Sequence, residues 1–315
     1  MADSAAVPAG QAAKRRSRGV PERRLALFMT APSMALIAIV ALWPIIYAVW
    51  LSLHQYSLIQ AGEVRWAVSD EFSWVPDGLG NYADALGSAE FWTVTRITFV
   101  FTIASVVLET IIGLGMAMAM HAAFKGQGLL RTVVLVPWAV LTVVTAIMWK
   151  TIFDPNLGFV NQLLGTDKVW LGEEPEALMV MIFADVWKTA PFMALLLLAG
   201  LQVIPGEIYE SAKMDGATAW QRFQKITLPL LMPALLVALI FRTLDALRAF
   251  DLPKVLTNGA NGTETLSLIA QRTFQENRLY GEGSALSILT FLIVMAVSFA
   301  YIKLVGGNIR GMTED

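Results

Sequence analysis

The chain has 315 residues, of which 56% are hydrophobic and 15% are charged, and its formal net charge at pH 7 is -2. This apolar fraction exceeds what a soluble domain hides in one core, so the composition predicts an integral membrane protein and gives no global field for binding nucleic acid. The chain has no cysteine and only two histidines, His54 and His121, which excludes a thiol nucleophile, a disulfide framework and a metal cluster rich in Cys or His.

Six stretches are long and apolar enough to cross a bilayer, because a hydrocarbon core about 30 Å thick needs about 20 helical residues. They cover residues 25–53, 92–120, 129–150, 177–202, 228–250 and 285–305. We therefore expect an all-α membrane protein with six transmembrane helices. Its parts are a disordered basic tail (1–24), a first transmembrane helix (25–53), an outer loop (54–91), a core domain (92–305) and a second tail (306–315).

Lysine and arginine set the expected orientation, since short loops rich in these residues stay in the cytoplasm. The tail 1–24 carries six of them, whereas the loop 54–91 carries only Arg65 against six carboxylates. Both termini and the loop 203–227 are therefore expected on the cytoplasmic side, and the loops 151–176 and 251–284 on the outer side. The basic tail is expected to lie against anionic lipid.

Two local signals fall between the first and fourth stretches. The run from Asp154 to Gly158, Asp-Pro-Asn-Leu-Gly, signals a turn, and the apolar residues after it predict a short helix at the outer interface. This helix either closes the loop or meets an external partner. Within the third stretch, Pro137 lacks a backbone donor and predicts a kink.

The loop 203–227 has the pattern of two helices joined by a turn. Pro205 can start a helix that ends near Met214, and Asp215-Gly216 then supplies a stop, because glycine adopts a positive φ without steric cost. Thr218 can cap a second helix. The apolar residues of that helix recur at a spacing compatible with one face: Trp220, Phe223 and Ile226. Such a structure either packs under its own bundle or fits a socket on another protein.

A resemblance to a known family favours the second alternative, docking on another protein. The spacing Glu210-Ser211-Ala212, three residues, Gly216, nine residues, Ile226, one residue, Leu228-Pro229 resembles the EAA motif of permease subunits in binding-protein-dependent ABC importers. Ser211 stands where the motif usually has alanine, which is a small-for-small change.

The resemblance covers about two thirds of the chain, from near Leu129 onward, and is strongest to the sugar-importing branch typified by the larger maltose permease subunit. The matching pieces include 187–191, 195–201, 204–205 and 250–259. Asn258-Gly259-Ala260-Asn261 departs from the Gly-Gly-Pro ending that is frequent there. The chain also resembles actinobacterial disaccharide importers, such as those for trehalose.

This resemblance implies the permease fold of type I ABC importers in a bacterial plasma membrane, and import of a disaccharide such as trehalose or maltose. The implied partners are a second permease, two ATPase subunits that use ATP and Mg, and an extracytoplasmic solute-binding lipoprotein. The chain itself would be non-catalytic and bind neither cofactor nor metal. Independently, it contains no G-x-x-x-x-G-K-[ST] phosphate loop. The residues implied to dock the ATPase are Glu207, Glu210, Ser211, Ala212, Asp215, Gly216 and Phe223.

Ionisable groups in the fourth and fifth stretches repeat every three residues and so line one face of each helix: Asp185 and Lys188, then Arg242, Asp245 and Arg248. Such groups are costly in a membrane, so they either neutralise one another or contact a ligand. Trp187, Phe192 and Phe250 lie beside them, and flat aromatic faces next to polar groups suit carbohydrate.

The resemblance carries the maltose permease's sugar-contacting positions onto eight residues: Asp185, Lys188, Thr189, Phe192, Arg242, Asp245, Ala246 and Ala249. Several of these are charged here where the maltose permease has amide or small residues, so the substrate or its pose is expected to differ. Glu109 stands alone in the second stretch. A proton relay or a hydrogen bond to a neighbouring helix or partner permease would each account for it, and we assign it no role.

Two other classes of protein are alternatives to the permease interpretation. A proton-coupled secondary carrier would explain the buried charges, but such carriers are built from internal repeats, and the pattern of the loop 203–227 occurs once. A membrane-embedded enzyme would need a nucleophile with a base or a metal cluster, and no residues with that spacing are present.

Overall fold

The computed structural model describes residues 22–57, 64–69, 72, 75–122 and 125–312. The predicted tail 1–24 lies outside these residues except for its last three, which are helical because α1 (Glu22–Ile37) begins at Glu22. The second predicted tail is also partly helical, because the last helix continues to Met312. By their contacts the residues divide into two units, Met1–Tyr47 and Ala48–Asp315.

The described part of the first unit is one run of helix. It consists of α1, a π-helical turn η1 (Ala38–Leu42) and the beginning of α2 (Trp43–Ser52). Apolar side chains such as Leu27, Phe28 and Ile39 are exposed along it. A helix that is apolar all round suits a lipid environment, and the stretch Ala26–Ser52 is long and apolar enough to cross a membrane.

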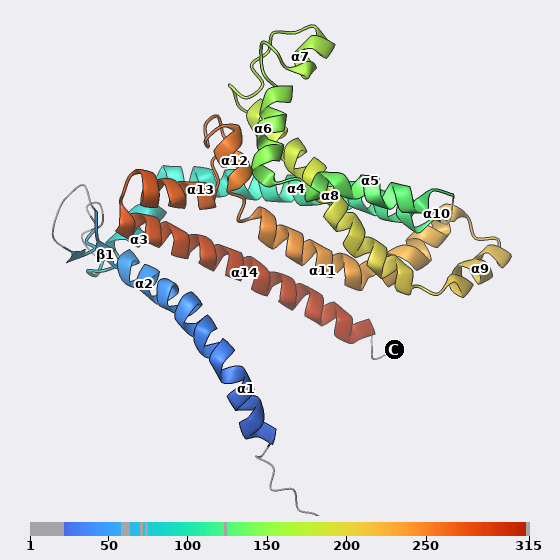
Figure 1. Ribbon diagram of the computed structural model, residues 1–315, viewed down its shortest axis with the longest axis horizontal. Coiled ribbons are helices and arrows are strands. Elements are labelled where there is room, and N and C mark those ends of the chain that lie inside the picture. The colour runs from blue at the N-terminus through green and yellow to red at the C-terminus, as the bar shows by residue number, and fades with distance from the viewer. Residues whose placement is uncertain (1–21, 58–63, 70–71, 73–74, 123–124, 313–315) are drawn as a thin grey trace, which may run out of the picture. The chain divides into compact units, whose positions relative to one another are not determined.

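Four long helices run through the second unit and meet the same criterion: Ala89–His121 (α4), Glu176–Val203 (α8), Ala219–Ala246 (ending in α11, Leu228–Ala246) and Tyr280–Tyr301 (in α14, Tyr280–Met312). Figure 1 shows α4, α8 and α11 side by side, and these helices pack on one another. Two glycines permit this closeness. A Cβ on Gly113 would lie 2.8 Å from Met193, and one on Gly200 would lie 2.4 Å from Ala234.

The third predicted span, 129–150, is not one straight helix. It consists of α5 (Gln127–Ala139) and α6 (Thr142–Ile152), which are bent by 90°. Val140 and Leu141 between them are extended, with ψ of 136° and 139°. The bend follows Pro137, which was expected to kink the helix, but it is far sharper than a proline kink alone produces.

Short elements occupy the connections. The expected helix after the Asp154 turn is α7 (Phe159–Leu164). Near the start of the second unit, β1 (His54–Gln55) pairs antiparallel with β2 (Arg65–Trp66), and α3 (Gly80–Gly87) precedes α4. His54 is buried between the rings of Trp50 and Trp66, each with its centroid 4.3 Å from that of His54. After α11 come α12 (Asp251–Leu256), α13 (Leu266–Gln271) and the π-helical turn η3 (Arg272–Glu276).

The predicted ends of the last two spans shift by a few residues. The fifth was expected to end at residue 250, but α11 ends at Ala246. The sixth was expected to begin at residue 285, but α14 begins at Tyr280.

Apolar side chains form a core between α4, α8 and α11 at two levels, one around Phe101 and Met181 and the other around Leu197 and Leu231.

Candidate functional site

The loop that joins α8 to α11 is the predicted pair of short helices. The first, α9 (Gly206–Met214), starts after Pro205, and the chain turns at Gly216, whose φ is +74°. Thr218 then caps α10 (Ala219–Arg222): its hydroxyl accepts from the Gln221 backbone N–H, and its own N–H donates to the Gln221 side chain. The π-helical turn η2 (Phe223–Thr227) continues α10 directly into α11.

This loop leaves most of its side chains exposed. Met214 is 88% exposed and Trp220 is 63% exposed, and the Trp220 ring stacks on Phe223 at 5.4 Å. Of the seven predicted docking residues, Ala212 and Phe223 are half-buried and the other five are exposed. One side-chain hydrogen bond, 3.0 Å between the hydroxyls of Tyr209 and Thr227, ties α9 to η2. Packing under the bundle therefore does not account for this surface, and α9 and α10 lie together at one end of the second unit (Figure 1).

A pocket of about 330 Å³ lies among α5, α6, α8, α11 and the start of α12. Nine of the eleven residues predicted to contact substrate line it: Asp185, Lys188, Thr189, Arg242, Asp245, Ala246, Arg248, Ala249 and Phe250. The structure thus brings together residues from two helices that are far apart in sequence. The facing polar stripes expected on the fourth and fifth spans are present.

The two remaining predicted residues lie elsewhere. Trp187 packs edge-on against Trp149 at 6.3 Å, and Phe192 stacks on Trp138 at 5.7 Å. Neither lines the pocket. Trp187 points to another face of α8, whereas Phe192 shares the face of Asp185 and Lys188 and lies behind Trp138, which lines the pocket. Trp138 does line it and was not predicted. It lies in the last turn of α5, just before the break between α5 and α6.

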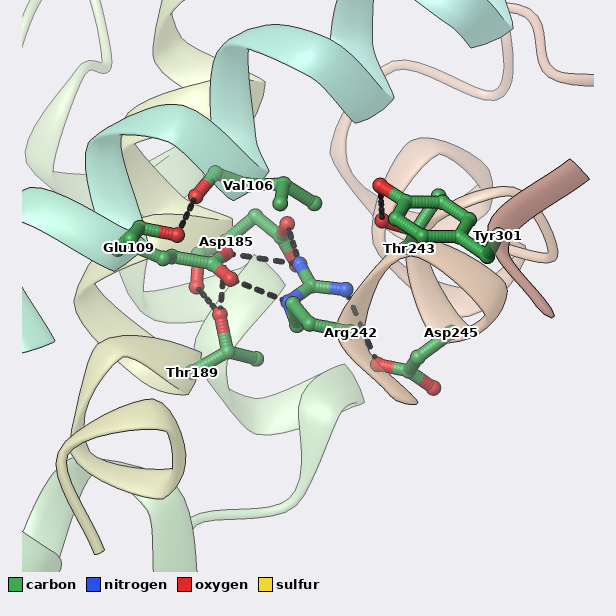
Figure 2. Close-up of polar contacts among 9 residues, drawn as sticks. Val106, Glu109, Asp185, Thr189, Arg242, Thr243, Asp245 and Tyr301 are labelled. Atoms are coloured by element: carbon green, nitrogen blue, oxygen red, sulfur yellow. Dashed lines mark hydrogen bonds and ion pairs between the residues drawn. The ribbon is translucent and has the colours of Figure 1, made fainter. Parts of the chain in front are cut away.

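Arg242 lines the pocket and is the centre of an ion-pair network (Figure 2). Its side chain is only 2% exposed. Its Nε and Nη2 donate to the two carboxylate oxygens of Glu109, with 2.8 Å between Nη2 and Oε1. Nη2 also donates to Asp185, and Nη1 donates to Asp245 at 3.1 Å. The network therefore joins α4, α8 and α11.

Glu109 is fully buried in this network and does not line the pocket. The Thr189 hydroxyl on α8 donates to it at 2.6 Å. Of the explanations considered for this carboxylate, the hydrogen bond to a neighbouring helix is the one that the structure contains. Sequence reasoning could not name its partner, because Arg242 lies on a different span.

Two further cations line the pocket. Lys188 is half-buried, and Arg248 is exposed and donates from Nε to the carbonyl oxygen of Leu244 at 3.1 Å. Within the described residues neither forms an ion pair. Together with Arg242 they balance Glu109, Asp185 and Asp245 in formal charge, although Asp251 also lies at the pocket wall.

Comparison with known proteins identifies the family. Residues 111–310 match the family described as the binding-protein-dependent transport system inner membrane component. The chain belongs to this family. It is therefore the permease subunit of an ABC importer, which is non-catalytic, and ATP is hydrolysed by separate ATPase subunits. The alternative of a secondary carrier is set aside.

Individual relatives of this permease match over most of their length. The trehalose transport system permease protein SugA of Mycobacterium tuberculosis is 40% identical over 290 residues, which are 92% of this chain and 91% of SugA. The trehalose/maltose transport system permease protein MalF of Thermococcus litoralis is 42% identical over 292 residues, covering 90% and 94% of the two chains. In fold, a permease chain of the bacterial ABC transporter that imports alginate matches with a TM-score of 0.75 at 21% identity, over 90% of this chain and 96% of that one.

Proposed function

We propose that this permease carries an uncharged disaccharide of the trehalose or maltose type across the bacterial plasma membrane, as one half of a path shared with a second permease. The observation that carries the proposal is the pocket at Arg242. Its volume of about 330 Å³ falls within the range of small-molecule sites, roughly 300–1,000 Å³. It lies between transmembrane helices, as a transport path requires.

The charges of the pocket support a polyhydroxylated and neutral cargo. Carboxylates and cations are interleaved there, so hydroxyl groups can both donate and accept, whereas no single sign of charge dominates to select an ion. Phe250 and Trp138 add aromatic faces at its wall, which suit the C–H surfaces of a sugar ring. The relatives named for trehalose and maltose agree with this class of substrate.

The loop 204–227, called the coupling loop from here on, is proposed to face the cytoplasm and to seat in a cleft of an ATPase subunit. Its exposed tryptophan and methionine give it apolar surface that a partner would cover. Glu210, exposed on α9, is proposed to pair with a basic group of the ATPase, which binds ATP and Mg. An extracytoplasmic solute-binding protein would deliver the sugar at the opposite side. The related alginate importer has been solved in complex with such a periplasmic protein.

Reconstitution tests the substrate. The chain is coexpressed with a second permease, an ATPase and a solute-binding protein from the same genome, and the purified complex is placed in liposomes. We expect uptake of radiolabelled trehalose or maltose that requires ATP and is unaffected when the proton gradient is collapsed. Uptake of neither sugar by an assembled complex that hydrolyses ATP would refute the substrate class.

A charge reversal tests the coupling. Glu210→Lys should abolish ATP-driven uptake while the permease pair still assembles, because the coupling loop no longer pairs with its proposed basic partner. Glu173→Lys makes the same change at an exposed carboxylate of the loop 151–176 and should leave uptake unchanged. Equal uptake by both variants would exclude this role for Glu210.

A further inference from the structure

The hydrogen bonds of Arg242 fix the direction of its guanidinium group. An arginine side chain has five N–H groups, and four of them are used within the described residues. Glu109 accepts two, Asp185 accepts one and Asp245 accepts one. The remaining N–H is on Nη1, the nitrogen that also contacts Asp245. This nitrogen lies on the side of the guanidinium that faces Asp245 (Figure 2), and Asp245 lines the pocket.

Glu109 and Asp245 hold the guanidinium from opposite sides. Glu109 is fully buried on α4 behind Arg242, whereas the side chain of Asp245 is 68% exposed toward the pocket. The Glu109 contact uses both carboxylate oxygens, so it sets the plane of the guanidinium as well as its position. The Asp245 contact is a single bond at 3.1 Å. The stronger of the two restraints therefore comes from the residue that a bound sugar cannot touch.

We infer that Glu109 is a positioning residue for sugar recognition and acts through Arg242. This inference rests on the proposed function, because it takes the pocket as the sugar site. By holding Nε and Nη2, Glu109 directs the free N–H of Nη1 and the outer oxygen of Asp245 toward the cargo. Without Glu109, the guanidinium would turn to Asp185 and Asp245 and occupy the carboxylate oxygens that accept from sugar hydroxyls.

A double-mutant cycle of Glu109 and Arg242 tests this role, with sugar uptake as the measurement. Glu109→Gln should raise the KM for trehalose uptake by about tenfold, the size of one charge-assisted hydrogen bond, with the maximal rate per assembled complex unchanged. In an Arg242→Met background the same substitution should leave KM unchanged, because there is no guanidinium to hold. Glu90→Gln, an exposed carboxylate on the same helix, is the matched control and should transport as the wild type does.

Three results would overturn the inference. One is a KM that stays at the wild-type value while only the amount of assembled complex falls, since this is the behaviour of a purely structural ion pair. Another is an equal rise in KM with and without Arg242. If Glu109→Gln fails to assemble, Glu109→Asp is measured in its place. It keeps the charge but is one methylene too short to reach both nitrogens, and an unchanged KM for it also refutes the role.

A second arm needs no sugar and so separates this inference from the proposed substrate. The chain has no cysteine, so Ala249→Cys places a single thiol at the pocket wall. Anionic and cationic methanethiosulfonate reagents are compared on it. Glu109→Asp keeps the charge, so any change in the ratio reports the position of the guanidinium: it should raise the anionic-to-cationic rate ratio several-fold when Arg242 is present and leave the ratio unchanged with Arg242→Met. If the ratio does not depend on Arg242, the positioning role is wrong even if trehalose is the substrate.

Discussion

Nη2 of Arg242 lies 2.8 Å from Oε1 of Glu109, although the two residues are 133 positions apart in the chain. The contact joins α4 to α11, and apolar side chains such as Val106 and Leu239 pack nearby. Removing one member of a buried ion pair leaves the other charge without a partner, which costs far more than the intact pair contributes.

We therefore expect Arg242→Met to lower the stability of the assembled complex by about 3–5 kcal/mol, measured by thermal unfolding in detergent. The combined variant Glu109→Gln with Arg242→Met should recover part of this loss, because one stranded carboxylate is removed. If the combined variant is as unstable as the sum of the two single variants, the pair is not coupled in stability.

Gly216 allows a clean test of the turn in the coupling loop. Its φ of +74° is accessible to glycine, and nothing lies within 4 Å of where a Cβ would be, so a substitution there acts through the backbone alone. Gly216→Val should cost about 1–2 kcal/mol and weaken copurification of the ATPase. Gly216→Asn, which tolerates this region, should copurify almost as well as the wild type. Similar losses for both variants would contradict the backbone argument.

The Thr218 cap should control the local stability of α10. Thr218→Ala removes the acceptor of the Gln221 N–H and is expected to cost about 1 kcal/mol of helix stability. Faster hydrogen exchange of the amides in α10 of Thr218→Ala, measured by mass spectrometry, would show this loss of stability. Thr218→Ser keeps the hydroxyl and should preserve protection, so equal exchange in the two variants would speak against the cap.

Gly200 sets the distance between α8 and α11. Gly200→Ala would place a Cβ 2.4 Å from that of Ala234, and the helices would have to separate. We expect a loss of about 1–3 kcal/mol in thermal unfolding. Gly115→Ala on α4 is the control, because a Cβ there meets nothing within 4 Å. A larger effect at Gly115 than at Gly200 would be inconsistent with this packing.

Asp154 should make the turn before α7 sensitive to acid. Its carboxylate accepts the backbone N–H groups of Asn156 and Leu157, each at 2.9 Å, and these bonds hold its pKa below the ordinary 3.8. A lowered pKa means that the stabilisation is complete above pH 3.8 and is lost as pH falls through the folded-state value. Amide protection factors at 156 and 157 should therefore drop in acid. Asp154→Asn, which does not titrate, should show no such step.

The sequence was sufficient where the signals are local. The helix, turn and helix of the coupling loop follow from Pro205, Gly216 and Thr218, each of which acts within a few residues of itself, and all three behave as expected. The stripes on α8 and α11 were also predictable, because a spacing of three residues fixes which side chains share a helical face.

The parts that could not be predicted depend on tertiary contacts. Pro137 predicted a kink, but the 90° bend lies at two extended residues further on, Val140 and Leu141. The pocket takes lining residues from both sides of that bend, Trp138 and Thr142. Likewise, nothing near Glu109 indicates its partner, since an ion pair between helices is set by how they pack. Whether Trp187 and Phe192 contact a substrate stays a prediction, since neither lines the pocket itself and each packs on a tryptophan of the third span.

The run from α10 through η2 into α11 is helical without a break over Ala219–Ala246, 28 residues long. At 1.5 Å per residue, Trp220 and Arg242 are about 33 Å apart along it, so a tilt of about 10° about one end displaces the other by about 6 Å. That displacement is twice the length of the hydrogen bond to Glu109. A tilt of this size, driven by movement of the coupling loop, must therefore either break the ion pair between Arg242 and Glu109 or move α4 together with α11.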